Sequence, residues 1–195
     1  MSHPPARPPR RADARHNADK ILDAAVACLS RNADASVSEI AQSAGVGRVT
    51  LYGHFPSREV LVEAALQRVL AEGEKVLESL DLTGDPRHAL SVLIRSSWLL
   101  IAQSSAVLEA AQTALPPERV QQLHLKPAQR VDELIHRGQA TGAFRVDLPP
   151  DWLTSVLHHV MHGAANDVAA GRLDRTDAPV FITETILAAY APTGR

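Results

Sequence analysis

SVSEIAQSAGVGRVTLYGHFPSR, residues 36–58, is the stretch of the chain that decides the fold. Ser36 and Glu39 form the pattern S-x-x-E, a capping box that satisfies the first free N–H groups of a helix. Ile40, Ala41 and Ala44 then give this helix an apolar stripe. Gly45 follows where a helix commonly ends in a left-handed backbone conformation, which glycine adopts at little cost. A short helix over residues 37–44 is therefore predicted.

A second short helix is predicted over residues 48–54, three residues after that glycine. Leu51 and Phe55 are four residues apart, so both side chains can point into a core. The outer faces are left to Arg48, Val49, Thr50 and Tyr52. Two helices joined by a tight turn, with the second offering polar and methyl groups outward, have the form of a DNA-binding helix-turn-helix.

The run AGVGRVTLYGHFPSRE, residues 44–59, resembles the signature of the tetracycline-repressor (TetR) family of transcription regulators. The segment Ile21–Ala25 is similar to the first helix of that family, and the resemblance covers about residues 17–62. The chain departs from the family at Gly47, where Ser or Thr often caps the recognition helix, and at Gly53, where a longer side chain is common. Because the C-terminal domains of the family diverge widely, the resemblance does not identify the effector.

The resemblance implies an all-α fold, with an N-terminal three-helix DNA-binding domain and a C-terminal helical domain for ligand binding and dimerisation. It also implies a homodimer on a double-stranded DNA operator. The residues expected at base edges are Arg48, Val49 and Thr50, since arginine pairs with guanine and methyl groups contact thymine. The residues expected to position the protein on phosphates are Thr50, Tyr52, His54 and Arg58.

Composition and the resemblance together predict three segments of the chain. Residues 1–16 contain four prolines and four arginines and are predicted to be a disordered basic arm, either a solvated tail or a segment that reaches DNA. The resemblance implies that residues 17–62 form the DNA-binding domain and that residues 63–195 form the effector-binding and dimerisation domain. The apolar periodicity predicts about nine helices, over residues 18–29, 37–44, 48–54, 58–80, 86–103, 105–114, 117–137, 152–170 and 179–190.

Charge and cysteine content agree with a regulator in the cytoplasm. The net charge is −2, but residues 1–60 hold 8 Lys and Arg against 6 Asp and Glu. This mild positive excess gains meaning because it coincides with the helix-turn-helix. The single cysteine, Cys28, excludes an internal disulfide. The N-terminus lacks the apolar segment of a signal peptide, and the apolar stretch around Trp98–Ile101 is expected to be too short and interrupted to span a membrane.

The C-terminal region offers candidates for a dimer interface and an effector site. Small residues at 163–165 permit a close helix–helix contact, either with a second copy or within the chain. The expected interface residues are Val160, Gly163, Ala164, Val168 and Ile186. The expected effector-binding residues, each of which could equally be ordinary packing, are Arg95, Trp98, His124, Phe144, Trp152 and Met161.

The sequence argues against a metal site and against an enzyme. His158 and His162 are four residues apart and could share a metal, but no carboxylate follows at ligand spacing. Surface or interface histidines are the preferred interpretation, and no cofactor is expected. A small helical enzyme is a remote alternative, because no catalytic triad, phosphate loop or dinucleotide motif is present. The sequence therefore favours a repressor released from a palindromic operator by a small-molecule effector; an activator or a ligand-independent regulator is the alternative.

Overall fold

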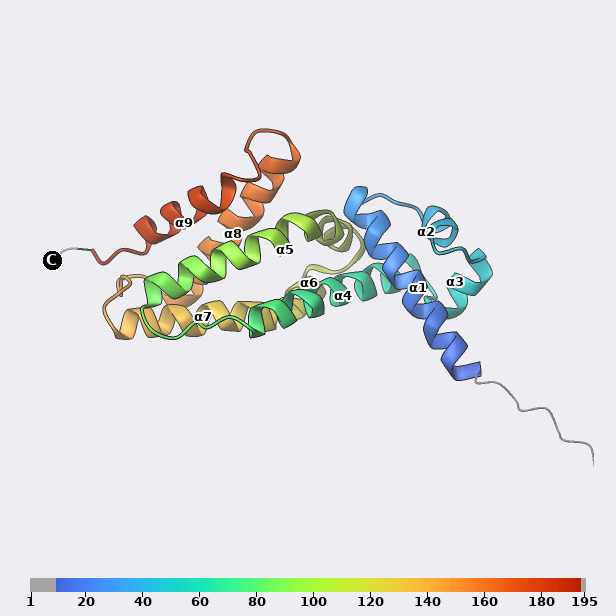
Figure 1. The fold of residues 1–195 in the computed structure, drawn as a ribbon, viewed down its shortest axis with the longest axis horizontal. Helices are drawn as coiled ribbons and strands as arrows, with labels where there is room; N and C mark the ends of the chain where they lie inside the picture. The colour runs from blue at the N-terminus through green and yellow to red at the C-terminus, as the bar shows by residue number, and fades with distance from the viewer. Residues whose placement is uncertain (1–9, 194–195) are drawn as a thin grey trace, which may run out of the picture.

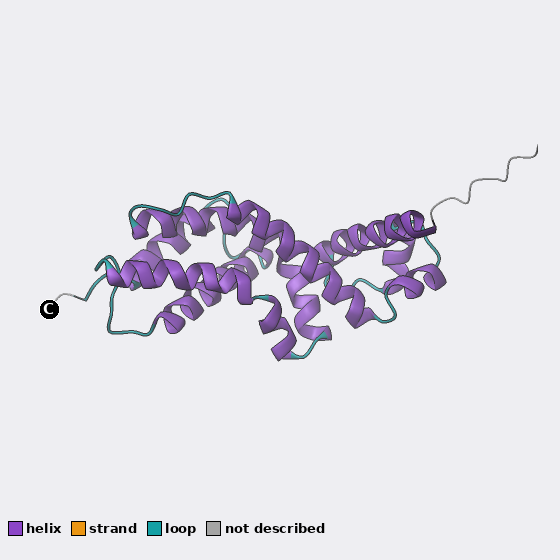
Figure 2. Ribbon diagram, turned by 90° about the horizontal axis from the view of Figure 1, so that it is seen from below, coloured by secondary structure: helices purple, strands orange, loops and turns teal. Residues whose placement is uncertain are grey.

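The structure is a computed structural model that describes residues 10–193, apart from the side chains of residues 10–13 and 125–127. Within residues 10–193 it contains nine α-helices and no strand, as predicted. The helices form an elongated molecule, with the helix-turn-helix at one end and the C-terminal helices at the other (Figures 1 and 2). Their bounds are α1 Arg10–Arg31, α2 Val37–Ser43, α3 Arg48–His54, α4 Arg58–Glu78, α5 Pro86–Ala114, α6 Pro117–Leu123, α7 Leu125–Ala140, α8 Pro150–Ala169 and α9 Ala178–Ala189.

The first helix begins earlier than predicted. It starts at Arg10, so residues 10–16, which we expected to be part of a disordered arm, are helical. This segment follows the last proline of the arm and is rich in alanine and arginine, which favour helix. The remainder of the predicted arm, residues 1–9, lies outside the described residues.

The central helix α5 is continuous, whereas the sequence predicted a break near Ser104. The Ser104 hydroxyl donates a hydrogen bond of 2.7 Å to the Leu100 carbonyl oxygen, one turn earlier, so the serine stays within the helix. At 29 residues, α5 is long and apolar enough to cross a membrane by length and composition, contrary to our expectation. A packed core helix meets the same criteria, and α5 contacts α4, α7, α8 and α9.

The interruption between α6 and α7 lies closer to the N-terminus than predicted. The sequence placed an interruption near Pro127, but the chain leaves the helical path at His124, between α6 and α7. Pro127 lies in the first turn of α7, where its missing N–H group costs nothing because no intrahelical acceptor is available there.

Two apolar cores hold the helices together. The first core joins α1–α3 and the start of α4 to the last turns of α5, and includes Leu51, Leu66 and Leu108. The second core joins the start of α5 to α7, α8 and α9, and includes Trp98 and Ile186. Helices α4 and α5 have the most extensive mutual contact and run from one region to the other (Figure 1). The helix-turn-helix is therefore packed directly on helices that continue into the C-terminal region.

Candidate DNA-binding and effector sites

The N-terminus of α2 has the predicted capping box. The Glu39 N–H donates to Ser36 Oγ at 3.2 Å, and the Ser36 N–H donates to Glu39 Oε2 at 2.7 Å. The Ser36 contact lowers the pKa of the Glu39 carboxyl, because these hydrogen bonds stabilise its charged form. The start of the helix-turn-helix is thus determined by residues that are three apart in the sequence.

The turn after α2 has the geometry that the glycine predicts. Gly45 has a φ of 67°, the left-handed conformation. The Val46 N–H donates to the Ala41 carbonyl oxygen at 3.0 Å, and the Gly45 N–H donates to that of Gln42 at 3.1 Å. This pair of hydrogen bonds is a Schellman motif, which satisfies the last carbonyls of the helix. The turn directs the chain into α3, whose N-cap Gly47 offers no side-chain hydrogen bond.

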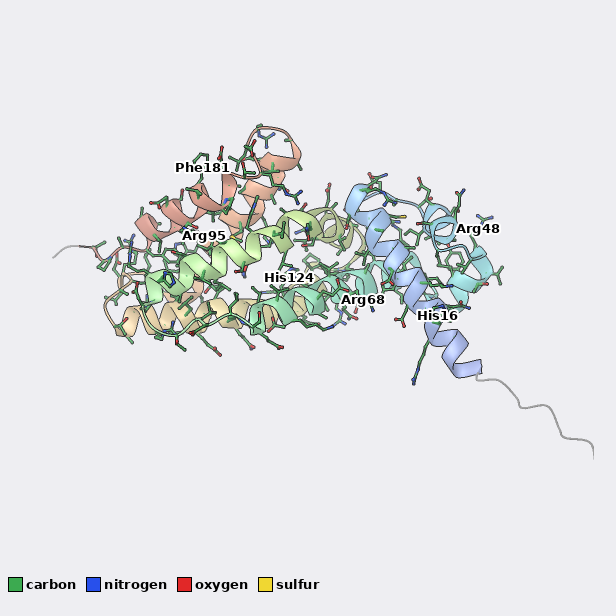
Figure 3. The ribbon with its side chains drawn as sticks, in the orientation of Figure 1. His16, Arg48, Arg68, Arg95, His124 and Phe181 are labelled. Atoms are coloured by element: carbon green, nitrogen blue, oxygen red, sulfur yellow. The ribbon has the colours of Figure 1, made fainter. Side chains whose placement is uncertain are left out.

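Helix α3 is anchored on one side and open on the other. Leu51 is fully buried in the first core, and Phe55 packs against that core while remaining partly exposed. Val49 is 88% exposed and Tyr52 is 46% exposed. The structure thus brings five of the six predicted DNA-facing residues to one accessible helix, on which Figure 3 labels Arg48. The exposed ones are Arg48, Val49, Thr50 and Tyr52, while His54 is half-buried.

Arg58 has a structural role that the sequence did not suggest. Its guanidinium donates hydrogen bonds to the Ala35 carbonyl oxygen and, at 3.0 Å, to the Ala33 carbonyl oxygen. Both acceptors lie in the loop between α1 and α2, and the Arg58 side chain is half-buried. At least two of its N–H groups are thus engaged within the protein, so Arg58 holds the start of α4 against the loop that precedes the helix-turn-helix.

A cavity of about 110 Å³ lies among α4, α5, α7 and α8, beside the C-terminal end of α6. His124 contributes to the cavity wall, and its label in Figure 3 lies between the ribbons of α5 and α4 in that view. The wall is mainly aliphatic, with a few polar side chains. It is lined by Leu66, Val69, Leu70, Gly73, Glu74, Leu77, Leu93, Ile94, Ser97, Leu100, Ile101, Ser104, Leu108, His124, Val131, Leu157, His158, Met161 and His162.

Only two of the six predicted effector residues, His124 and Met161, line this cavity. Arg95 is exposed, and Trp152 is 58% exposed at the start of α8. Two others are buried but belong to the packing of the second core. Trp98 donates from Nε1 to the Arg175 carbonyl oxygen at 3.1 Å, and the Phe144 ring meets the Tyr190 ring edge-on, with centroids 5.8 Å apart. Arg95, Trp98, Phe144 and Trp152 therefore lie outside this cavity.

The sequence analysis missed two histidines of the cavity wall. His158 and His162 were interpreted as surface or interface residues, but both line the cavity next to Met161. Burial, together with the nearby rings of His124 and His158, lowers the pKa of His162 to about 4. Burial also lowers the pKa of His158. The available signal was their placement one turn apart on an apolar helix, on either side of Met161.

The predicted dimer residues divide into two groups. Ile186 is 0% exposed and belongs to the second core, so the prediction that it contacts a second copy is wrong. Val160, Ala164 and Val168 are partly buried against the same core. Gly163 is exposed, and no atom lies within 4 Å of a Cβ built there. On the neighbouring helix α9, the Phe181 side chain, which is labelled in Figure 3, is 55% exposed.

Comparisons with known proteins identify the N-terminal region. The profile described as "Bacterial regulatory proteins, tetR family" matches residues 21–65. An HTH-type transcriptional regulator of Mycobacterium tuberculosis is 33% identical over 103 residues, which are 51% of each chain. This chain thus spans about half the length of that relative. The HTH-type transcriptional repressor LfrR of Mycolicibacterium smegmatis is 26% identical over 141 residues, covering 72% of this chain and 73% of LfrR.

The fold as a whole has close counterparts among solved structures. The transcriptional regulator FadR of Bacillus subtilis, solved in complex with stearoyl-CoA, matches with a TM-score of 0.73. The match covers 87% of this chain and 97% of FadR at 18% identity, so it shows a shared fold. These relatives are described as transcriptional regulators, in agreement with the expectation that the chain is not an enzyme. The family profile and the helix-turn-helix geometry agree on residues 21–65, which are similar to the tetR family of bacterial regulatory proteins.

Proposed function

We propose that the protein is a cytoplasmic transcriptional repressor that binds a palindromic DNA operator as a homodimer and is released by a small-molecule effector. The observation that carries this proposal is the exposed face of α3. A buried Leu51 fixes the helix on the first core, while Arg48, Val49 and Thr50 remain accessible at its N-terminal end. An anchored helix with free polar and methyl groups suits the major groove of DNA.

The contacts that we propose divide by type. Arg48 would read guanine, and the methyl groups of Val49 and Thr50 would contact thymine. Tyr52 and His54, from the second turn of α3, would position the helix on phosphates together with Thr50. Arg58 is proposed as a positioning residue, because its guanidinium is hydrogen-bonded to the α1–α2 loop.

A second copy of the chain is the proposed partner, across α8 and α9. A palindromic operator requires a two-fold related reader, with half-sites about 34–36 Å apart. Gly163 on α8 and Phe181 on α9 are both exposed on neighbouring helices. A glycine allows close helix approach, and a large apolar ring supplies area to bury.

The cavity is the proposed effector site, and two residues of its wall also belong to the core that supports the DNA-binding region. Leu66 of α4 and Leu108 of α5 line the cavity and also belong to the first core, which anchors α3. A ligand that separates α4 from α5 would therefore alter the support of the recognition helix. Repression is proposed rather than activation because the regulator LfrR, which matches over 72% of this chain, is a repressor.

Footprinting on the DNA upstream of the protein's own gene tests this proposal. We expect a protected palindrome whose occupancy falls steeply with salt, because phosphate contacts release counterions. Arg48→Ala should relax base preference at one position of each half-site, at a cost of about 1–3 kcal/mol. Tyr52→Ala should weaken binding to all sequences alike. A protein that binds no DNA in any genomic library at low salt would refute the proposed function.

A further inference from the structure

The cavity is elongated along the two helices that connect the regions of the molecule. On α4 its lining residues run from Leu66 to Leu77, and on α5 from Leu93 to Leu108. At 1.5 Å per residue these intervals correspond to about 16 Å and about 22 Å. The positions on α4 recur every three or four residues, so a single face of that helix forms one wall. The occupant should therefore be long and narrow rather than compact.

The volume sets the size of the occupant. At about 10–15 Å³ for each water-sized position, 110 Å³ holds on the order of ten such positions, hence about ten non-hydrogen atoms. Gly73 of α4 lies in the wall, and a Cβ added there would meet Leu100 Cδ1 at 3.5 Å, an ordinary contact distance. A glycine within a helix is unfavourable relative to alanine. Here it keeps the wall recessed, which agrees with a space meant to be filled.

The charges around the cavity are already balanced within the protein. The Glu74 carboxylate, which lines the wall, accepts a hydrogen bond from the Arg130 guanidinium of α7. The imidazole of His162 is neutral at pH 7, because burial and the neighbouring histidine rings lower its pKa to about 4. The wall thus presents the neutral imidazole of His162 and one carboxylate that is paired with a cation.

His124 determines which hydrogen-bonding group the occupant must carry. Its Nδ1 lies 2.9 Å from the Val120 carbonyl oxygen. A carbonyl oxygen can only accept, so Nδ1 carries the proton, and in the neutral ring Nε2 is left as an acceptor. The ring lines the cavity together with His158 and His162. An acceptor in a mainly aliphatic wall is best satisfied by a ligand that donates a hydrogen bond.

We propose that the effector is an uncharged, elongated aliphatic molecule of about ten non-hydrogen atoms, bearing a hydroxyl group that donates to His124 Nε2. This inference rests on the proposed function, since it specifies the ligand of the same cavity. Its aliphatic part lies between α4 and α5, and its hydroxyl lies at the histidines where α6 ends and α8 passes.

Charged molecules of the same shape fit less well. A carboxylate in the cavity meets the Glu74 carboxylate and needs a protonated histidine as partner. Protonating His162 to serve as that partner is unfavourable at pH 7, because its pKa is lowered to about 4. An ammonium group has one carboxylate available, Glu74, which Arg130 already contacts. An uncharged ligand avoids both penalties.

Calorimetric titration of the full-length protein with matched ten-carbon probes tests the proposal. The probes are decan-1-ol, its ether isomer 1-methoxynonane, sodium decanoate and decylammonium chloride, each at pH 8. We expect decan-1-ol to bind at one site per chain, and roughly tenfold more tightly than the ether, which has the oxygen but lacks the donor. Decanoate and decylammonium should bind more weakly than the alcohol. Decanoate or decylammonium binding as tightly as decan-1-ol, or no binding of decan-1-ol, overturns the proposal.

Substitutions in the wall locate the site. Gly73→Leu should abolish binding of both the alcohol and the ether, while Gly73→Ala should retain both. His124→Leu should bind the two probes equally, and His124→Gln, which restores an acceptor, should recover a preference for the alcohol. Equal preference for the alcohol in wild type and His124→Leu assigns the hydroxyl to another residue and overturns the role of His124.

The same probes separate this inference from the proposed function. Decan-1-ol should release operator DNA from the wild-type protein and not from Gly73→Leu. If the protein binds DNA but does not bind decan-1-ol, the proposed function stands and the proposed ligand class is refuted. If the protein binds decan-1-ol with the stated preferences but binds no DNA, the proposed ligand chemistry stands and the proposed function is refuted.

Discussion

The helix-turn-helix and the cavity are built in opposite ways. In the helix-turn-helix, the deciding contacts join residues close in sequence: Ser36 with Glu39, and Val46 with Ala41. In the cavity, the wall joins residues as far apart as Leu66 and His162, brought together by four helices. Local contacts can be inferred from a sequence pattern, whereas a cavity depends on how whole helices pack. The first site is therefore readable in the sequence, and the second is visible only in the structure.

The largest effect is expected from a substitution that removes the buried anchor of the helix-turn-helix, Leu51. Leu51→Ala should lower the free energy of unfolding by about 2–5 kcal/mol, because it leaves a cavity at a fully buried position of the first core. DNA binding should fall with it, since α3 loses its support. Val49→Ala is the matched control, as Val49 is 88% exposed and should change stability by no more than about 0.5 kcal/mol. Equal losses in urea unfolding for the two variants would contradict the placement of α3.

The next largest effect is a loss of stability in acid, which we expect from the burial of His162 in the cavity wall. The pKa of His162 is lowered to about 4 in the folded protein, so as pH falls below its ordinary value of 6.5 the unfolded chain takes up a proton first. Stability is therefore fully present above pH 6.5 and is lost as pH falls toward 4, by up to about 3 kcal/mol for this group.

The comparison of wild type with His162→Gln isolates this contribution, because glutamine does not titrate. Urea unfolding at pH 7.5 and pH 4.5 should show a smaller acid loss of stability in His162→Gln than in wild type. The same acid loss in both proteins would mean that the His162 ring is exposed to water, and would remove one argument for a neutral cavity wall.

Particular residues show where sequence reasoning succeeded and failed. The positions of Gly45 and Leu51 were predicted because a turn and a helix face depend only on nearby residues. Ile186 was misassigned because periodicity identifies an apolar face without saying whether its partner is the same chain or a second copy. His158 and His162 were placed at the surface because a polar residue on a helix is usually exposed. The continuity of α5 was missed because a serine can bond back to its own helix.

A smaller effect tests the turn that the sequence predicted. Gly45→Ala places a side chain on a backbone with φ of 67°, which costs about 1–2 kcal/mol for an ordinary residue. No atom lies within 4 Å of a Cβ at Gly45, so the cost is conformational and not steric. Gly45→Asn should lose less stability than Gly45→Ala, since asparagine tolerates this conformation better. A higher unfolding temperature for Gly45→Ala than for Gly45→Asn would contradict the left-handed turn.

The smallest effects set one helical glycine of each region against the other. Gly53 lies in α3 with no atom within 4 Å of an added Cβ, and Gly73 lies in α4 with Leu100 Cδ1 at 3.5 Å. Because a glycine in a helix loses more backbone entropy than alanine, each Gly→Ala change should stabilise the protein by about 0.5–1 kcal/mol.

Larger side chains should have different effects at the two positions. Leucine at 53 projects into open space and should fold like alanine, while leucine at 73 fills the cavity and should prevent ligand binding. Stability and ligand titration of the four variants decide this, and a Gly73→Leu protein that still takes up ligand would show that the wall at α4 does not bound the effector site.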